Sequence, residues 1–258
     1  MRIALISDLH LEFDQPLPAL NPAAELIVLA GDNHSQLDSL EVAAYYRREY
    51  GVPVLLLAGN HEFYGGDIER LLPALRAGAA ALEGVYFLEN DAVEIGGVRF
   101  LGCTLWSDCA LSGAERIAFH RERAGALVPD FKLIEQRGAL FTPELAALRS
   151  DESYRWLEAE LAKPFAGKTV VVTHFSPHRA AIHPHFLKPG SDELTPYFTR
   201  DCSALMRCFT IDAWLFGHTH GSVDAVVEGR TRLVSNQRGY PGEPPGYTQF
   251  DPLKLVEL

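Results

Sequence analysis

The sequence VLLLAGNHE, residues Val54–Glu62, joins an unbroken apolar run to a short polar cluster. A run of about four to eight apolar residues that ends at glycine is typical of a buried strand. In open α/β sheets, ligands bind beyond the carboxyl ends of such strands. The stretch therefore predicts a strand over Val54–Ala58 and a functional loop over Gly59–Glu62.

Four other apolar runs have the same organisation. The predicted strands are Ile3–Ile6, Leu26–Ala30, Val170–Val172 and Ala213–Phe216. The polar clusters that follow them are Asp8-Leu9-His10, Gly31-Asp32-Asn33, Thr173-His174 and Gly217-His218-Thr219-His220. Because each cluster follows a strand, we expect all five to lie where the strands end and to form one site.

The remaining elements predict a layered α/β protein. Apolar residues spaced by three and four positions indicate helices at 37–44 and 68–82. A third helix is expected to begin at Thr142-Pro143, an N-cap followed by proline at the first helical position, and to end before Pro164. Further strands are expected at Val85–Leu88, Ala92–Ile95, Val98–Leu101, Val223–Glu228 and Thr231–Val234, with extended segments at Tyr247–Phe250 and Lys254–Leu258. The pattern indicates two groups of strands, one in each half of the chain.

The chain is interpreted as one domain over residues 1–258. Residues 107–141 are its least regular part, with scattered charges and one periodic stretch. A long excursion inside a compact domain is often functional, so we predict that it forms a lid or cap over a binding site.

Composition is typical of a soluble globular protein, with 47% hydrophobic and 22% charged residues. No basic leader precedes an apolar stretch, and no apolar run reaches the roughly 20 residues that span a bilayer. A cytoplasmic location without membrane association is expected. The four cysteines lack the spacing of a zinc knuckle and are expected to be reduced thiols.

The formal net charge of −11 argues against a long nucleic acid as partner. Affinity for nucleic acid comes from lysine and arginine side chains that neutralise phosphates. Two divalent cations would reverse the sign of the charge locally. A small phosphorylated substrate therefore remains compatible with the acidic composition.

The polar clusters supply seven candidate donors for metal ions. They are Asp8, His10, Asp32, Asn60, His174, His218 and His220. A carboxylate can bridge two divalent ions while imidazoles and oxygen donors complete each shell, and the lack of thiolates favours Mn, Fe, Zn or Ni over a structural zinc site. Each cluster alone has a simpler explanation, such as a turn capped by Asp32 or an exposed loop around His218. Their joint order favours a centre of two metal ions, which can clamp the oxygens of a phosphoryl displacement.

The series Asp8-x-His10, Gly31-Asp32, Gly59-Asn60-His61-Glu62, His174 and Gly217-His218-x-His220 resembles the calcineurin-like metallophosphoesterase family. All five blocks occur in order over residues 8–220. The resemblance implies a four-layer α-β-β-α sandwich with two mixed sheets. It also implies two divalent metal ions and the hydrolysis of phosphoric esters.

By position, the resemblance distributes the ligands over two ions. One ion takes Asp8, His10, Asp32 and His220, and the other takes Asp32, Asn60, His174 and His218. A hydroxide between the ions would attack phosphorus. The resemblance further implies that Asn60 and His61 contact the phosphate and that His61 protonates the leaving oxygen as the general acid.

One position departs from the family pattern. Many members carry an acid three positions after the aspartate of the second block, where it orients the catalytic histidine. The residue at that position is Ser35, preceded by His34. A carboxylate fixes the tautomer of an imidazole and raises its basicity. We therefore expect His61 to be held differently or less firmly.

Other residues are candidates for substrate binding. His178, His183 and His185 follow the predicted ligand His174, and they either bind phosphate or are ordinary loop histidines. Arg238 either binds phosphate oxygens through its guanidinium or pairs with an acidic loop for stability. The loops at 107–141 and 178–200 are expected to set specificity.

The leading interpretation is a hydrolase of a small phosphodiester or phosphomonoester. A nuclease or pyrophosphatase of the same fold is disfavoured by the net charge of −11 and by the lack of an amphipathic membrane helix. A catalytically silent scaffold that binds protein partners would be expected to lack ligands, and none is missing. The sequence indicates neither the natural substrate, nor the physiological metal, nor an oligomeric state.

Overall fold

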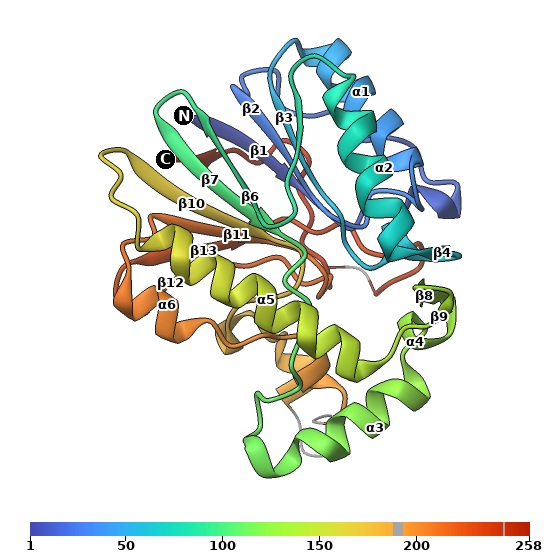
Figure 1. Ribbon diagram of the computed structural model, residues 1–258. Helices are drawn as coiled ribbons and strands as arrows, with labels where there is room; N and C mark the ends of the chain where they lie inside the picture. The colour runs from blue at the N-terminus through green and yellow to red at the C-terminus, as the bar shows by residue number, and fades with distance from the viewer. Residues whose placement is uncertain (188–192, 245) are drawn as a thin grey trace.

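Two β-sheets lie face to face in the computed structural model, and helices cover their outer faces (Figure 1). The structure describes residues 1–187, 193–244 and 246–258. Both sheets combine parallel and antiparallel strands. The predicted four-layer α-β-β-α sandwich with two mixed sheets is therefore confirmed.

The first sheet has four parallel strands and one antiparallel edge strand. Its order is β14-β1-β2-β3-β5, with β1 at Arg2–Ile6, β2 at Leu26–Ala30, β3 at Val54–Leu57, β5 at Val85–Phe87 and β14 at Val256–Glu257. Helices α1 (Asp38–Tyr50) and α2 (Ile68–Ala80) connect its parallel strands and cover its outer face (Figure 1). Parallel neighbours require such crossover connections.

The second sheet has its parallel strands in the centre and an antiparallel strand at each edge. Its order is β12-β13-β11-β10-β7-β6, with β12 at Asp224–Val227, β13 at Thr231–Ser235, β11 at Ala213–Phe216, β10 at Lys168–Thr173, β7 at Val98–Cys103 and β6 at Asp91–Ile95. Helix α5 (Pro143–Leu161) lies along its outer face, and α6 (Ser203–Cys208) lies near β12 (Figure 1). Helix α5 begins where predicted, because Thr142 Oγ1 accepts a hydrogen bond of 3.3 Å from Leu145 N. No helix in the described part of the chain is both long and apolar enough to cross a bilayer.

Successive residues of the central strands face different parts of the core. Ile3 and Leu5 of β1 pack between the two sheets, whereas Ala4 and Ile6 pack beneath the helices. All four are at most 1% exposed. Because such strands are buried on both faces, their sequences are continuously apolar rather than alternating.

Two expectations about the strands were wrong. The strands do not divide by halves of the chain, because β6 and β7 belong to the second sheet and β14 returns to the first. The segment Tyr247–Phe250 is not a strand, and β14 pairs with β1 only over two residues. Edge strands are assigned by tertiary packing, which local apolar patterns do not specify.

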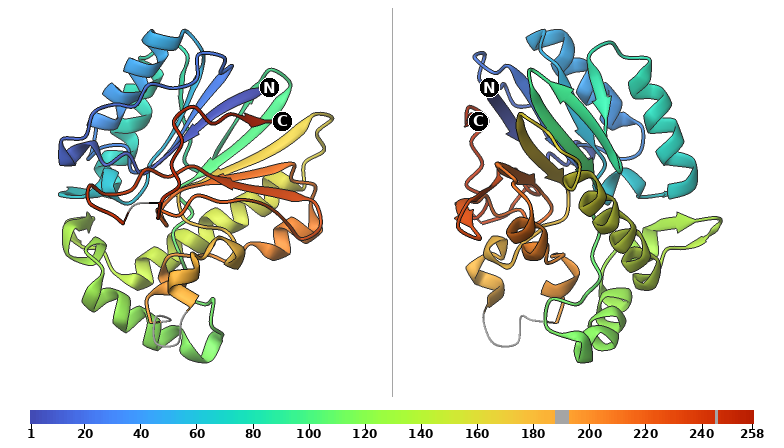
Figure 2. Two further views of the ribbon diagram at one scale, coloured as in Figure 1. Left: turned by 180° about the vertical axis from the view of Figure 1, so that it is seen from behind. Right: turned by 60° about the vertical axis from the view of Figure 1, so that its left-hand side comes forward.

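The excursion at 107–141 has secondary structure of its own. It contains η3 (Ala114–Arg116), α3 (Ile117–Leu127), α4 (Asp130–Leu133), β8 (Ile134–Gln136) and β9 (Ala139–Leu140), and β8 pairs with β4 (Gly66–Asp67) in a small third sheet. Figure 2 shows it beside the segment near residue 200, at one end of the sandwich. Arg123 Nε donates a hydrogen bond of 2.9 Å to Glu193 Oε2 across this contact. That the excursion acts as a lid stays a prediction.

Candidate metal centre

The five polar clusters meet where five parallel strands end. Strands β1, β2 and β3 are neighbours in the first sheet, and β10 and β11 are neighbours in the second. Asp8 N donates to Gly31 O at 3.0 Å within the first sheet, and His218 N donates to Asp8 Oδ1 at 2.9 Å between the sheets. The sheet order therefore joins the loops into one site.

Five of the predicted ligands have a left-handed backbone conformation. Their φ angles are 54° at Asp8, 45° at His10, 52° at Asp32, 74° at His218 and 53° at His220. Residues other than glycine rarely adopt positive φ, although aspartate and histidine do so more readily than most. All five side chains are buried. Such conformations persist where the surrounding structure enforces them, and they cluster at functional sites.

The first group of candidate ligand atoms belongs to Asp8, His10 and His220, which lie within 4.8 Å of one another. The two imidazole Nε2 atoms, of His10 and His220, are 3.1 Å apart. His220 Nε2 also lies 3.6 Å from Asp8 Oδ1. The predicted ligands of one ion are thus together, and Asp32 Oδ2 lies 4.0 Å from His10 Nε2.

The second group of candidate ligand atoms belongs to Asp32, His174 and His218. These atoms also lie within 4.8 Å of one another. His174 Nε2 lies 3.3 Å from Asp32 Oδ2 and 3.1 Å from Asn60 Oδ1. His218 Nε2 is buried and has no hydrogen-bond partner among the described residues. Asp32 therefore lies between the two groups, as a bridging carboxylate would.

Three of these imidazoles present Nε2 to the centre while Nδ1 is engaged elsewhere. His174 Nδ1 donates to Ala30 O at 2.9 Å, His10 Nδ1 donates to Glu12 Oε1 at 3.0 Å, and His220 Nδ1 contacts the Glu243 carboxylate. Metal-binding histidines usually donate their other ring N–H to a carbonyl or carboxylate, which fixes the tautomer. The donor set therefore fits divalent metal ions.

The buried charges shift the pKa values of the proposed ligands in both directions. Burial opposes protonation of His174, but the charge of Asp32 outweighs it and raises the pKa of that imidazole to about 9, so a metal ion would have to displace its proton. Burial opposes the ionisation of Asp32, but the positive charges of His174 and His61 outweigh it and hold the pKa of that carboxyl well below its usual value. Burial and the positive charge of His174 keep the pKa of His218 well below its usual value. An ionised carboxylate and a neutral imidazole are the forms that ligate metals.

His61 lies beside the two groups on the short helix η2 (His61–Phe63). Its Nδ1 is 2.8 Å from Glu12 Oε1, its Nε2 is 3.0 Å from the Tyr240 hydroxyl, and its ring stacks on Tyr64 with centroids 4.1 Å apart. Burial opposes protonation of the ring, but the charges of Asp32 and Glu12 outweigh it and raise the pKa of His61 to about 9. One candidate ligand atom of His61 also lies within 4.8 Å of those of His10 and Asp32. A protonated His61 beside the centre can donate a proton.

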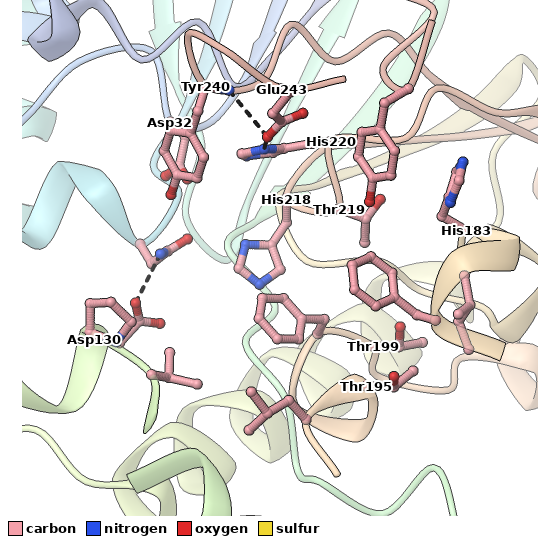
Figure 3. A pocket seen from close by; sticks show the side chains of 18 of the residues that line it. Asp32, Asp130, His183, Thr195, Thr199, His218, Thr219, His220, Tyr240 and Glu243 are labelled. Atoms are coloured by element: carbon pink, nitrogen blue, oxygen red, sulfur yellow. Dashed lines mark hydrogen bonds and ion pairs between the residues drawn. The ribbon is translucent and has the colours of Figure 1, made fainter. Parts of the chain in front are cut away.

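A cavity of about 620 Å³ opens beside the centre (Figure 3). Four predicted ligands line it, namely Asp32, Asn60, His218 and His220. The excursion contributes Val128–Asp130, and the loop after β10 contributes Ile182 and His183. Pockets of roughly 300–1,000 Å³ accommodate small molecules.

Comparison of the sequence and the fold with those of known proteins shows the family of the chain. A family model for calcineurin-like phosphoesterases matches residues 1–222. The chain belongs to this family. The phosphoesterase is similar to an uncharacterized protein of Acanthamoeba polyphaga mimivirus. The two sequences are 23% identical, and the match covers 98% of this chain and 95% of the viral protein. The fold of the phosphoesterase is similar to that of the phosphopantetheinyl hydrolase from Mycobacterium tuberculosis, with a TM-score of 0.69, 19% identity, and coverage of 95% of this chain and 94% of that chain.

Glu12 is the main residue of the phosphoesterase that sequence reasoning missed. It lies on η1 (Leu11–Phe13), two positions after His10, and its Oε1 contacts Nδ1 of both His10 and His61. Burial opposes its ionisation, but the hydrogen bonds from these rings outweigh it and lower the pKa of Glu12 to about 2. The carboxylate expected at position 35 therefore comes from the first loop. The signal was the alternation Asp8-x-His10-x-Glu12.

Sequence reasoning noted Tyr240 beside Arg238 but gave it no role, and it missed Glu243, although both belong to the polar surroundings of the centre. The Tyr240 ring lies 4.2 Å from the His10 ring and 4.6 Å from the His220 ring, measured between centroids. Figure 3 shows Tyr240, Glu243 and His220 at the same end of the cavity as Asp32. Tyr240 and His10 lie far apart in the sequence, whereas Glu243 contacts His220 from only 23 positions away, and in neither case does a local pattern indicate the contact.

Two buried carboxylates, of Glu62 and Asp130, hold residues of the second group of candidate ligands in place through hydrogen bonds. Glu62 accepts hydrogen bonds from the backbone N–H groups of Asp32, Asn33 and Gly59 at 2.7–3.0 Å, and thereby fixes two of the ligand loops. Burial and the charge of Asp32 raise the pKa of Glu62. Asp130 Oδ1 accepts a hydrogen bond of 3.0 Å from Asn60 Nδ2, which leaves Asn60 Oδ1 directed at His174.

The structure does not bring every candidate to the cavity. His178 lies 3.4 Å from Glu228 and accepts a hydrogen bond from Ala180 N, so it caps η4 (Arg179–Ala181). Arg238 Nη1 donates to Pro16 O at 2.7 Å; within the described part of the chain, Arg238 neither lines the cavity nor pairs with an acidic side chain. His183 lines the cavity, and the side chain of His185 lies outside the described residues.

Proposed function

We propose that this phosphoesterase hydrolyses small phosphoric esters with the help of two divalent metal ions. Asp8, His10, Asp32 and His220 would hold one ion, and Asp32, Asn60, His174 and His218 the other. The position of Asp32 between the two groups of donors carries this proposal. Bound ions would supply positive charge for the phosphoryl oxygens and would lower the pKa of water so that hydroxide is available.

His61 is proposed as the general acid. Since Nδ1–H is donated to Glu12, the ring can give a proton from Nε2 only when it is the imidazolium. The raised pKa of about 9 supports that state near neutral pH. Nε2 contacts the Tyr240 hydroxyl at 3.0 Å, and this oxygen marks a position that a leaving oxygen can reach.

Asn60 is proposed both to bind a metal ion and to touch the substrate phosphate. Its Oδ1 faces His174, and its Nδ2 donates to Asp130 and, at 3.3 Å, to the Tyr64 hydroxyl. Asn60 also lines the cavity. A phosphate oxygen that approaches from the cavity would compete with these partners for Nδ2.

The proposal is tested with purified protein loaded with Mn. It should hydrolyse p-nitrophenyl phosphate, bis-p-nitrophenyl phosphate, or both, and a chelator should abolish the activity. The solved neighbour named as a phosphopantetheinyl hydrolase makes a phosphopantetheinyl ester a sensible addition to cyclic nucleotides and sugar phosphates in a wider panel. Protein that holds two ions per chain but turns over no phosphoester would favour the scaffold interpretation.

A further inference from the structure

The walls of the cavity differ in chemistry from one end to the other. One end is formed by the predicted ligands, and the remainder is largely apolar. The apolar and aromatic residues that line it are Val128, Pro129, Ile182, Phe186, Leu194, Phe198 and Tyr247. A phosphate bound by the metal ions would leave its organic substituent facing these residues.

The described lining residues include no lysine or arginine. Besides the predicted ligand Asp32, the described carboxylates that reach the cavity are engaged with protein partners: Asp130 with Tyr64 at 2.6 Å, Glu193 with Arg123 at 2.9 Å, and Glu243 with His220. A second phosphate or a carboxylate on the substituent would need a cationic partner when buried. These walls therefore favour an uncharged substituent.

Thr199 adds one polar feature to this apolar part. It is 1% exposed, it lines the cavity, and its Oγ1 has no hydrogen-bond partner among the described residues. Its backbone is fixed, because the Thr199 carbonyl accepts a hydrogen bond of 3.3 Å from Ser107 Oγ. Figure 3 shows Thr199 on the other side of His218 from Asp32. A buried hydroxyl without a partner is costly, and a ligand group could satisfy it.

We propose that this cavity binds the organic arm of the substrate ester, and that the arm is uncharged, mainly apolar, and carries a hydrogen-bonding group for Thr199. The inference rests on the proposed function, because the metal centre would hold the phosphate end. It selects esters of lipid-like or amide-bearing alcohols over nucleotides and sugar bisphosphates. The apolar wall supplies affinity, and Thr199 selects among arms of equal length.

Binding of alkylphosphonates to the full-length, Mn-loaded protein tests the proposal by calorimetry, without any need for turnover. The phosphonate group represents the phosphate, and methyl-, butyl- and octylphosphonate differ only in the arm. Since each buried CH₂ group strengthens binding by up to about fourfold, we expect Kd to fall at least about tenfold from methyl to octyl. A carboxylate at the end of the octyl chain should remove that gain.

The outcomes separate this inference from the proposed function. Equal affinity for all chain lengths would overturn the inference while leaving the metal centre in place. No binding of any phosphonate would overturn both. An octyl arm that ends in a carboxylate and still binds as tightly as octylphosphonate would overturn the uncharged character of the arm.

Two matched pairs of variants locate the arm. Phe186→Ala should reduce the gain from the octyl chain, whereas Phe119→Ala, at a residue of similar exposure on α3 outside the cavity, should keep it. Thr199→Val should weaken binding of phosphonates with an amide in the arm but not of octylphosphonate. Thr231→Val, in β13, removes another buried hydroxyl that has no hydrogen-bond partner in the described ranges, and it should change neither. Identical behaviour within each pair would place the arm elsewhere and overturn the proposal.

Discussion

Glu12 Oε1 lies 2.8 Å from His61 Nδ1 and 3.0 Å from His10 Nδ1, so a single carboxylate oxygen joins the proposed general acid to a proposed metal ligand. The family resemblance led us to expect an acid from the second loop to orient His61, but this chain has Ser35 there. Here the carboxylate comes from the first loop. Any change at Glu12 should therefore affect the acid and one metal shell together.

Glu12→Gln should lower turnover about 10- to 100-fold, because the amide keeps the shape of the side chain but removes the charge that holds His61. The loss should grow as the pKa of the leaving alcohol rises, since only poor leaving groups need the proton. The measurement is kcat over a series of aryl phosphate esters. Glu41→Gln, at an exposed position of α1, is the matched control. A uniform loss over the whole series in protein that still holds both ions would contradict the positioning role.

His61→Ala should lower kcat by about 10²- to 10⁴-fold, the contribution of a positioned proton donor. Both metal ions should remain, because His61 belongs to neither proposed shell. Metal content by mass spectrometry and kcat are measured on the same preparation. His178→Ala is the control for a histidine outside the cavity. Loss of an ion from His61→Ala would make this residue a ligand instead of the acid.

Asp32→Asn should lose both ions, whereas His218→Ala should lose one. The reason is that Asp32 Oδ2 faces His174 at 3.3 Å and His10 at 4.0 Å, one from each group, while His218 belongs only to the second group. Titration with Mn, followed by calorimetry, gives the number of ions per chain. Asp32→Asn that still binds two ions would show that Asp32 does not bridge them.

Mn should raise the thermal midpoint of unfolding, and a chelator should reverse the rise. An ion that binds only the folded chain stabilises it by about 2.7 kcal/mol at 100 times its Kd. Differential scanning calorimetry at several Mn concentrations measures the effect. Asp32→Asn serves as the control, and a shift of equal size in that variant would mean that Mn acts elsewhere.

Gly59→Ala should abolish metal binding although it adds only one methyl group. A Cβ at this position would overlap Asp32 Oδ1 and lie 2.6 Å from His174 Nε2, so both proposed ligands would have to move. Gly125→Ala in helix α3 is the control, since its nearest neighbour would lie at 3.3 Å and alanine favours the helix. Circular dichroism confirms folding, and Mn titration gives the result. Normal Mn binding by Gly59→Ala would contradict the geometry.

The central strands could be predicted because burial on both faces leaves a continuous apolar run in the sequence, as in Val54–Leu57. The polar clusters were found for the same reason. A polar residue directly after such an apolar run must lie just beyond the carboxyl end of the strand. The pairing of β14 with β1 could not be predicted. It depends on a surface created by folding, and only two residues of the closing segment take part.

The surroundings of the centre were harder to predict than its ligands. Tyr240 contacts His61 across 179 positions, and Glu243 contacts His220 from a loop without a recognisable pattern. Glu12 lies only two positions after a motif residue, His10. Its role in orienting His61 depends on that ring, which follows another strand. Such partners are chosen by tertiary geometry, so a sequence motif reports the ligands and omits what orients them.

The left-handed turns at Asp8, His10, Asp32, His218 and His220 have a practical consequence for handling the protein. The chain itself bends these residues into place, because their loops are held by backbone bonds and by buried carboxylates such as Glu62. Ions should therefore enter a scaffold that is already shaped. One metal could then be exchanged for another by dialysis of the native protein, and the preparations compared directly, without a refolding step between them.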